Sequence, residues 1–427
     1  MLYKSLTRMK SLQVAWHHVR KSALASNNPD IKSAAQEFEE NCSTKLLSIQ
    51  SRLLKGTYQF PRAQGILKDR HKREASGKDP RPIVIATVEA RVVQRAILDV
   101  LQSPEDSPLH IHLGKICEVN SSPFSVGGIP NGGVPVGIQK TLTALQDGYS
   151  FFFKSDIAGF FTKITHAPVA DFVLEQTKDL RLAQLFTKAL NVELANKERL
   201  GRYFDLFPHD GIGVAQGSSL SAFAGNVLLH NFDRQLNTPA TRAYRYIDDV
   251  IIFGKTNEAV VTAKAAAKNA LKPLGMHFYD PSKNPDKADQ GHVRKGFVFL
   301  GCRIHDQRVT PDRNSIERAL KKVDNEIFAA KAVIDRLITN NDARNCEFAF
   351  IQSLGRIDNS LRSWGKSYSF TTDRLPFKQM DGQIDAKLEH YKAWFEAKSK
   401  SFTAQQVRRA LGIYLLTDTS LERLPSD

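Results

Sequence analysis

Two adjacent carboxylates stand between largely apolar runs in Ala243-Tyr244-Arg245-Tyr246-Ile247-Asp248-Asp249-Val250-Ile251-Ile252-Phe253. This pattern predicts a β-hairpin whose turn lies at Asp248-Asp249. A second apolar run, from Tyr149 to Ile157, predicts a buried central strand with Asp156 near its end. The two acidic sites are far apart in the sequence, so only the fold can bring them together.

Clustered carboxylates of this kind have a definite chemistry. They repel one another on a sheet and stay ionised only when cations lie between them. Oxygen ligands select magnesium or manganese. Two such ions can activate a hydroxyl group and stabilise a departing pyrophosphate in phosphoryl transfer. An Asp-Asp pair is also common in ordinary surface turns, so the pair alone leaves both interpretations open.

Further motifs follow one another in an order that resembles reverse transcriptases. Tyr246-Ile247-Asp248-Asp249, preceded by Arg245, resembles the YxDD box in the form typical of group II intron and retron enzymes. Asp156-Ile157-Ala158-Gly159-Phe160-Phe161 resembles the preceding metal-binding motif, and Gln216-Gly217-Ser218-Ser219-Leu220-Ser221 resembles the motif under the nascent base pair. Similarity to the fingers of group II intron enzymes is found in Leu54-Lys55-Gly56-Thr57-Tyr58, Gly77-Lys78, Arg81-Pro82-Ile83 and Arg91-Val92-Val93-Gln94.

The resemblance covers residues 15–305 and implies a fold. We expect an α+β right-hand polymerase fold with fingers, a palm made of a small antiparallel sheet with helices, and a helical thumb. The expected boundaries are 1–145 for the N-terminal helices and fingers, 146–305 for the palm with finger insertions, and 306–427 for the helical thumb and C-terminal region. Local patterns predict an extended hairpin over 60–86 with a polar basic loop, and helices over 88–101 and 166–200.

The resemblance also implies site residues. Asp156, Asp248 and Asp249 would be catalytic and would bind two Mg²⁺ ions, with Mn²⁺ as an alternative and the Ile157 carbonyl as a further ligand. Lys78 and Arg81 would contact the incoming triphosphate, because a planar guanidinium suits phosphate. Gln216 and Gly217 would lie at the nascent base pair. Contacts to primer and template would come from Tyr246, Phe299, Leu300 and Gly301.

Two positions of the nucleotide site have competitors nearby. Phe161 lies where the family has a steric gate, whose ring would exclude a 2′-hydroxyl group. Its neighbour Phe160 competes for this role, since one of the two rings must pack inward. Lys283 is the candidate for the lysine that protonates the leaving pyrophosphate, and Lys287 is its competitor.

Composition favours a partner that is a polyanion. The net charge is +15, and residues 1–100 contain 18 Lys and Arg against 9 Asp and Glu. Such an excess favours nucleic acid, since each neutralised phosphate releases counterions. The four cysteines, Cys42, Cys117, Cys302 and Cys346, are widely spaced, which is typical of reduced thiols. No apolar run is long enough for a membrane span, and a cytoplasmic location is expected. One apolar helical stripe is expected over Leu2, Leu6, Met9, Leu12, Trp16 and Val19.

The predicted function is RNA-directed DNA polymerase. Its partners would be an RNA template, a DNA primer or product, and deoxynucleoside triphosphates; a homo-oligomer stays open. Because no endonuclease finger, protease or integrase pattern is found, we expect a stand-alone bacterial enzyme of the defence-associated kind. Such enzymes are implicated in resistance to phage and often copy a cognate noncoding RNA. Alternatives are a retron enzyme, a protein-primed or template-independent DNA polymerase, and a catalytically inert RNA-binding scaffold. An RNA-dependent RNA polymerase is a further alternative, against which an aromatic gate at Phe161 argues.

Overall fold

In the computed structural model, an antiparallel sheet forms the centre of the first of two compact units. Residues 1–26, 28–340 and 349–419 are described, and the units are Met1–Val293 and Arg294–Asp427. The strand order is β4-β5-β3-β6, and β7 also pairs with β3. The strands are β3 (Phe151–Ala158), β4 (Thr241–Tyr246), β5 (Asp249–Gly254), β6 (His277–Phe278) and β7 (Ala288–His292). Residues 250–254 of β5 are all buried, which is typical of a central strand covered on both faces.

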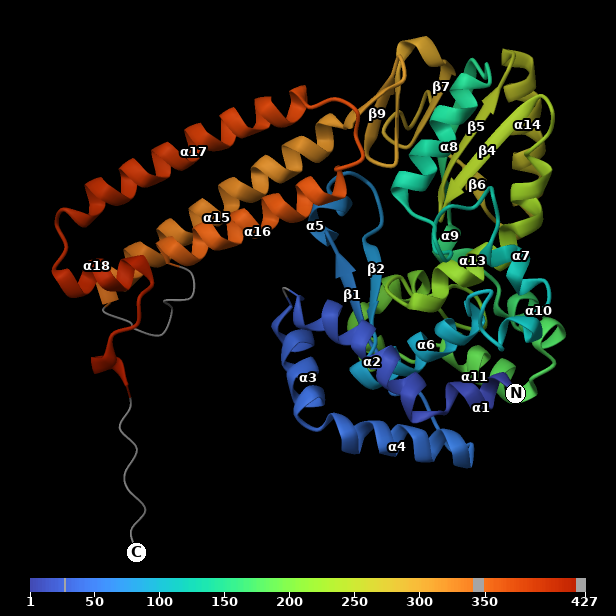
Figure 1. Ribbon diagram of the computed structural model, residues 1–427, viewed down its shortest axis with the longest axis horizontal. Coiled ribbons are helices and arrows are strands. Elements are labelled where there is room, and N and C mark those ends of the chain that lie inside the picture. Colours follow the sequence, from blue (N-terminus) through green and yellow to red (C-terminus); the bar gives the residue numbers. More distant parts are fainter. Residues whose placement is uncertain (27, 341–348, 420–427) are drawn as a thin grey trace, which may run out of the picture. The chain divides into compact units, whose positions relative to one another are not determined.

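Helices cover this sheet (Figure 1). α14 (Asn257–Leu271) packs against β5 and β3, while α8 (Val134–Gln146) and α13 (Ser219–Gln235) pack against β4. The hydroxyl of Ser218 accepts a hydrogen bond from the Leu220 N–H and caps the start of α13. The motif Gln216-Gly217-Ser218-Ser219 therefore ends in the N-terminal cap of this helix.

The apolar stripe at the N-terminus is buried except for the partly buried Met9, but it runs over two helices, α1 (Leu2–Leu6) and α2 (Met9–Leu24). Between them Arg8 has extended backbone. The side-chain amide of Gln50 donates to the carbonyl of Thr7 over 2.9 Å, which satisfies an acceptor at the end of α1. Further helices of this unit are α3 (Pro29–Glu40), α4 (Cys42–Lys55), α6 (Val88–Leu101), α7 (Ile116–Asn120), α9 (Phe160–Lys163), α10 (His166–Thr177) and α11 (Leu180–Leu190), with the short 3-10 turns η1 (His110–His112) and η3 (Lys272–Leu274).

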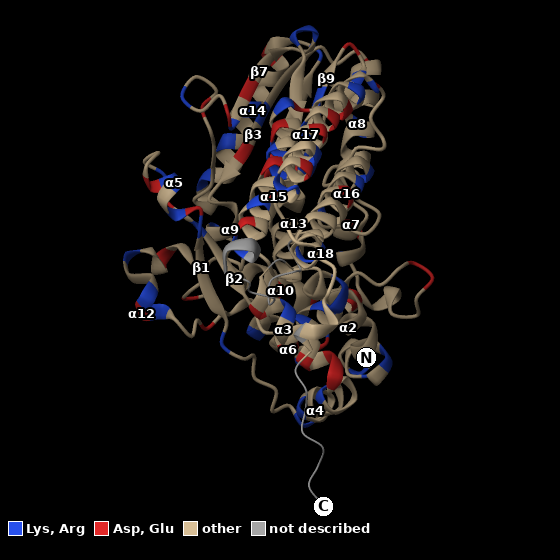
Figure 2. Cartoon of the chain, turned by 90° about the vertical axis from the view of Figure 1, so that its left-hand side faces the viewer, with Lys and Arg blue, Asp and Glu red and all other residues tan. Residues whose placement is uncertain are grey.

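The predicted extended hairpin consists of β1 (Gln64–Lys68) and β2 (Arg81–Ile85), paired antiparallel. The polar basic connection, predicted as a loop, contains the short helix α5 (Arg70–Glu74). Lys and Arg side chains lie on α5 and around α12 (Lys197–Leu200) (Figure 2). The hairpin is therefore a basic element, as the charge of this part of the sequence predicts.

The helix predicted over 166–200 is interrupted. α11 ends at Leu190, and residues 191–196 run beside β1, with a parallel bridge between Ala63 and Leu194. The Asn196 side chain accepts from the N–H of Gly65 over 2.9 Å and donates to its carbonyl over 2.8 Å. These two bonds take the place of backbone pairing with Gly65. Contacts with the hairpin thus outweigh the helical pattern of residues 191–196. α12 and η2 (Gly201–Leu206) follow, and a small apolar cluster joins them to the hairpin.

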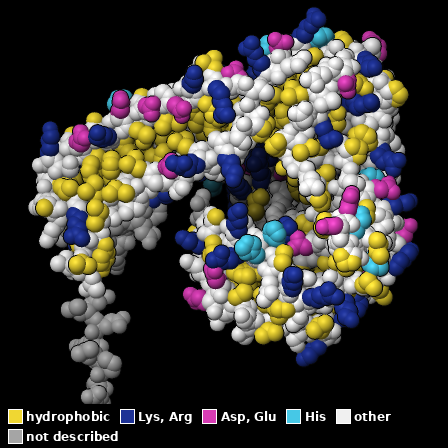
Figure 3. All heavy atoms as spheres, in the orientation of Figure 1, with side chains coloured by type: hydrophobic (Ala, Val, Ile, Leu, Met, Phe, Trp, Pro, Cys, Tyr) yellow, Lys and Arg dark blue, Asp and Glu magenta, His cyan; other side chains and the backbone are white. Residues whose placement is uncertain are grey.

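The second unit combines a small sheet with long helices. β8 (Phe297–Phe299), β9 (Cys302–His305) and β10 (Arg308–Pro311) are joined in the order β10-β9-β8. The helices are α15 (Arg313–Asn340), α16 (Phe350–Ser367), α17 (Leu375–Ser399) and α18 (Ala404–Leu411), followed by η6 (Leu416–Asp418); η4 (Val293–Lys295) spans the boundary between the units. Hydrophobic side chains gather along the face of this unit seen in Figure 3.

The structure describes three of the four cysteines, and its helices can be compared with the length and polarity of a membrane span. Cys42, Cys117 and Cys302 are free thiols, and Cys346 lies outside the described residues. Within residues 1–26, 28–340 and 349–419, no helix is both long and apolar enough to cross a membrane.

Candidate active site

The acidic hairpin has its turn one residue earlier than the sequence pattern predicted. Tyr246 and Asp249 are paired across β4 and β5, so Ile247 and Asp248 form the turn. Ile247 has a φ of +61°, a conformation that β-branched residues rarely adopt. Asp249 is the first residue of β5 and pairs with Asp156 of β3. The three aspartates therefore lie at one end of three neighbouring strands.

A cavity of about 400 Å³ opens beside this end of the sheet. It brings together six residues predicted from the sequence, which are Arg81, Asp156, Ile157, Phe161, Gln216 and Asp248. Also in its lining are Arg73, Tyr279 and Lys287. Asp249, Gly217, Lys78 and Lys283 are not among the lining residues that the structure describes.

The carboxylates at the cavity repel one another, which disfavours their ionised forms. Burial and the nearby Asp156 raise the pKa of Asp248. Burial and Asp156 also raise the pKa of Asp249, to about 7. The ammonium group of Lys287 contacts the carboxylate of Asp156 and supplies positive charge there. A cation beside these carboxylates would stabilise their ionised forms.

The donor set suits a magnesium ion completed by other ligands. Within the described residues, no group of three or more His, Cys, Asp or Glu side chains is arranged to hold a metal ion. Magnesium is commonly bound through one or two carboxylates together with water and substrate phosphates, rather than in an all-protein cage. Asp156 and Asp248, which both line the cavity, fit this kind of site.

The two neighbouring phenylalanines are in different environments. Both rings line the cavity, but Phe160 is only 2% exposed and packs against Gly225 of α13, whereas Phe161 is half-buried. Their rings meet edge to face, with centroids 5.0 Å apart. Of the two rings, Phe161 is therefore the more exposed at the cavity.

The turn before α13 is attached to the basic hairpin. The N–H of Val84 donates to the carbonyl of Gln216 over 3.3 Å. Gly217 has a φ of +116°, and a Cβ there would lie 3.2 Å from the Val84 carbonyl oxygen. A side chain at this position would therefore need an unfavourable backbone conformation and would also contact the backbone of Val84. Arg81, at the start of the same strand, lines the cavity.

The two candidate lysines differ in their contacts. Lys287 lies directly before β7, and its carbonyl accepts a hydrogen bond from the Asp156 N–H over 3.2 Å. The backbone of Lys283 belongs to a turn that starts at Asp280. Lys78 is exposed and lies 3.5 Å from the carboxylate of Asp286. Of the two lysines, Lys287 therefore contacts Asp156 and lines the cavity, whereas Lys283 is not among the lining residues described.

The predicted primer and template residues lie in both units. Tyr246 ends β4, and a Cβ on Gly127 would lie 3.0 Å from its ring. Phe299 is buried in the second unit, where Leu300 and Gly301 form the turn between β8 and β9. Both turn residues have positive φ, of 49° and 72°, which is typical of a tight hairpin.

Arg73 and Tyr279 line the cavity although the sequence did not single them out. Arg73 belongs to the basic run Arg70-His71-Lys72-Arg73, in which no pattern distinguishes one cation from the next. Its guanidinium donates to the carbonyl of Asp79 over 2.5 Å, a contact that closes the loop between β1 and β2. Tyr279 follows the short strand β6, which is paired with the end of β3.

Comparison with known proteins identifies the family of this chain. Residues 70–304 match the model of the reverse transcriptase (RNA-dependent DNA polymerase) family, which is more than half of the chain. The chain therefore belongs to this family. The predicted α+β polymerase fold is confirmed, and so is the enzyme class of RNA-directed DNA polymerases.

Individual relatives are distant. Protein YkfC of Escherichia coli is 24% identical over 306 residues, which are 62% of this chain and 73% of YkfC. Group II intron-encoded protein LtrA of Lactococcus lactis is 24% identical over 233 residues, covering 55% of this chain and 34% of LtrA. The match thus spans about a third of LtrA.

Solved structures were compared as well. A partial Cas6-RT-Cas1–Cas2 complex has a TM-score of 0.36 and 18% identity, covering 65% of this chain and 43% of that one. Apo telomerase from Candida tropicalis has a TM-score of 0.43 and 13% identity, with coverages of 76% and 62%.

Proposed function

We propose that this protein extends a DNA strand along an RNA template by nucleotidyl transfer at the cavity beside Asp156 and Asp248. One observation carries the proposal: the two carboxylates line a single cavity together with the aromatic ring of Phe161, the Gln216 turn and the guanidinium-bearing residues Arg73 and Arg81. A nucleoside triphosphate presents a base, a sugar and phosphates, and the lining offers a suitable group for each of them.

Asp156 and Asp248 would hold two magnesium ions, assisted by the Ile157 carbonyl and by Asp249. When bound, the ions make the primer 3′-hydroxyl more acidic and neutralise charge on the departing pyrophosphate. Arg81 and Arg73 would bind the triphosphate, since guanidinium groups pair bidentately with phosphate oxygens. Lys78, near the end of the basic loop, would approach the same phosphates from outside the cavity.

Lys287 is the better candidate for the proton donor to the leaving pyrophosphate. Its Nζ already contacts Asp156 at the cavity, so a proton on this atom is close to the site of the reaction. Lys283 was the first candidate from the sequence and serves as the comparison. A substitution of each lysine separates the two assignments.

Phe161 would select deoxynucleotides. A ring that lines the cavity beside Gln216 would contact the sugar of the incoming nucleotide, where a 2′-hydroxyl group would clash with it. Gln216 and Gly217 would lie against the nascent base pair, and Tyr246 against the primer end. Phe299, Leu300 and Gly301 would contact the primer from the β8–β9 turn.

The biological role that we propose is the copying of a cognate noncoding RNA in bacterial defence against phage. The motifs resemble those of bacterial reverse transcriptases, and the basic charge of residues 1–100 favours an RNA partner. Sequencing of the nucleic acid that copurifies with the protein tests the template. Loss of protection against phage in an Asp248→Ala strain tests the role, and retained protection would contradict it.

Extension of a labelled DNA primer on an RNA template with magnesium tests the activity. We expect synthesis by the wild type and by the control Asp171→Ala, which removes an exposed carboxylate on α10. Asp248→Ala is expected to abolish synthesis while RNA binding stays within about threefold. Synthesis at the wild-type rate by Asp248→Ala would refute the site.

The alternatives give distinct results in the same assay. Label that stays attached to the protein after ribonuclease treatment, without added primer, would indicate a protein-primed polymerase. RNA binding without synthesis from any primer or copurified RNA would indicate an inert scaffold. Incorporation of ribonucleotides in preference to deoxynucleotides would indicate an RNA polymerase.

A further inference from the structure

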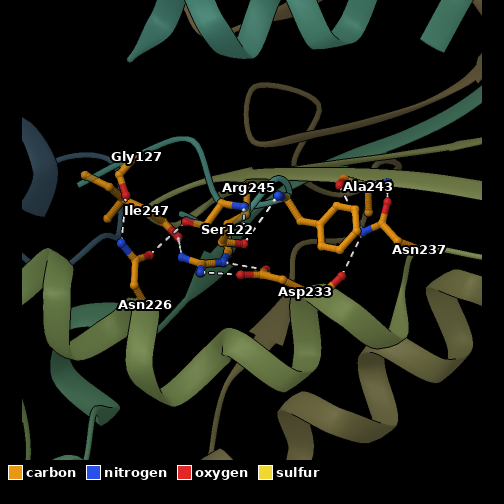
Figure 4. Close-up of polar contacts among 10 residues, drawn as sticks. Ser122, Gly127, Asn226, Asp233, Asn237, Ala243, Arg245 and Ile247 are labelled. Atoms are coloured by element: carbon orange, nitrogen blue, oxygen red, sulfur yellow. Dashed lines mark hydrogen bonds and ion pairs between the residues drawn. The ribbon is translucent and has the colours of Figure 1, made fainter. Parts of the chain in front are cut away.

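A buried ion pair lies directly behind the acidic turn. Arg245 is 1% exposed and Asp233 is 3% exposed. The guanidinium donates to both carboxylate oxygens, with Nε–Oδ1 and Nη2–Oδ2 distances of 2.7 and 2.5 Å (Figure 4). Asp233 belongs to α13 and Arg245 to β4, three residues before Asp248. The pair therefore joins a helix of the core to the strand that leads into the turn.

The same guanidinium also holds the turn itself. Its remaining terminal nitrogen, Nη1, donates to the carbonyl of Ile247 over 2.9 Å. Ile247 is the residue with a φ of +61°, and such a conformation persists only where the surroundings impose it. On the other flank, the N–H of Ile157 donates to the carbonyl of Asp248 over 2.7 Å. Both carbonyls of the turn are thus fixed by hydrogen bonds.

A second contact from α13 supports the turn through a loop. The side-chain amide of Asn226 donates to the carbonyl of Gly127 over 2.9 Å, and its oxygen accepts from the hydroxyl of Ser125 over 2.9 Å. Gly127 lies so close that a Cβ would be 2.9 Å from the Ile247 nitrogen. The backbone N–H of Arg245 donates to the Phe124 carbonyl in the same loop. Two polar side chains of one helix therefore hold the turn in place.

Stability alone is a weak reason for such a pair. Buried ion pairs are often no more stabilising than apolar residues of the same size, and their best-attested use is to fix one arrangement. The arrangement fixed here is the Ile247-Asp248 turn. Its positive φ at Ile247 is unfavourable for a β-branched residue, and Asp248 places its carboxylate at the cavity. A small displacement of a reacting group is costly, since an error of about 1 Å can slow a reaction about 100-fold.

We propose that Arg245 and Asp233 are positioning residues that hold the Ile247-Asp248 turn, so that their loss slows nucleotidyl transfer without weakening the binding of nucleotide or RNA. The inference rests on the proposed polymerase function. Neither side chain lines the cavity, and both act through the backbone of the turn. Arg245 provides three of its N–H groups in one plane, a geometry that lysine does not have.

Single-turnover extension with Arg245→Lys and Asp233→Asn tests the proposal. We expect the rate constant to fall about 10- to 100-fold, while the burst amplitude and the dissociation constants of deoxynucleotide and RNA stay within about twofold. Arg234→Lys and Glu118→Gln are matched controls, because they alter an exposed ion pair of 3.6 Å that includes the next residue of α13. Both controls are expected to keep the wild-type rate constant.

The outcomes separate positioning from simple loss of folded protein. A lower amplitude with an unchanged rate constant would mean fewer folded molecules and would overturn the proposal, as would a weaker nucleotide affinity that accounts for the whole loss. If wild type makes no DNA, the proposed function fails instead. Should Asp233→Asn not fold, Arg245→Lys still decides, because it retains the charge opposite Asp233.

A coupling experiment tests the role of the strained turn. Glycine adopts positive φ without a steric penalty, so the turn in Ile247→Gly depends less on the hydrogen bond from Arg245. We expect the fold-reduction of the rate constant by Arg245→Lys to be about three times smaller in the Ile247→Gly background than in the wild type. An equal reduction in both backgrounds would show that Arg245 does not act through this turn.

Discussion

Gly225 of α13 lies against the ring of Phe160, and its replacement by alanine is expected to disturb the gate beside it. A Cβ at this position would lie 2.3 Å from Cζ of Phe160 and 3.0 and 3.1 Å from its Cε1 and Cε2 atoms. Real carbon contacts are about 3.5–4.0 Å, so the ring must move by more than about 1 Å. Overpacking of this kind costs about 1–3 kcal/mol, and the better helix propensity of alanine returns about 1 kcal/mol. We expect the upper end of the overpacking cost, because the clash involves a ring that is 2% exposed, and hence a net loss of about 2 kcal/mol.

Thermal unfolding measures this loss, with Gly382→Ala as the matched control. Gly382 also lies inside a helix, α17, but nothing lies within 4 Å of its Cβ position. Alanine there is expected to stabilise by about 1 kcal/mol, so the two substitutions should shift the melting temperature in opposite directions. Gly225→Ala should also weaken sugar discrimination, since Phe160 supports Phe161. A Gly225→Ala protein that melts at or above the wild-type temperature would refute the packing argument.

Three further substitutions test separate parts of the site. Phe161→Ala should lower the preference for deoxynucleotides over ribonucleotides at least about tenfold in competition assays, and unchanged discrimination would place the gate elsewhere. Lys287→Met should slow single-turnover synthesis about 100-fold, whereas Lys283→Met should stay within about twofold; the reverse order would restore Lys283 as the proton donor. Asn196→Ala removes both side-chain hydrogen bonds to β1 and should destabilise this region by about 2 kcal/mol, seen as faster proteolysis between residues 191 and 213. Unchanged proteolysis would mean that the apolar cluster alone holds that segment.

The central strands and helices were predictable because their apolar patterns agree with the fold. The run from Tyr149 to Ile157 contains strand β3, which pairs with β5 and β7, and the pattern over 88–101 is the buried helix α6. Placing Asp156 and Asp248 at one cavity required the order of the motifs, since nothing local links two residues so far apart. In these places the sequence pattern and the tertiary packing favour the same structure.

The remaining features depend on contacts that no local pattern contains. The turn lies at Ile247-Asp248, although isoleucine disfavours positive φ, because Arg245 and the neighbouring strands fix it there. Residues 191–196 leave the predicted helix because the Asn196 side chain takes the place of a strand partner for Gly65. Lys287 contacts Asp156 because β7 pairs with β3, and a spacing along the chain does not reveal that pairing.

One helix connects the separate parts of this site, although few of its residues line the cavity. The turn that starts α13 accepts a hydrogen bond from β2, the strand that begins with the phosphate-binding candidate Arg81. Two turns along, Gly225 supports the ring beside the gate, and Asn226 holds the loop under the acidic turn. Near its end, Asp233 fixes Arg245. These contacts all belong to one helix, so the Gln216 turn, the Phe160 ring and the Asp248 turn share one support. Substitutions on this inner face should therefore alter catalysis more than equal changes on the exposed side of the helix.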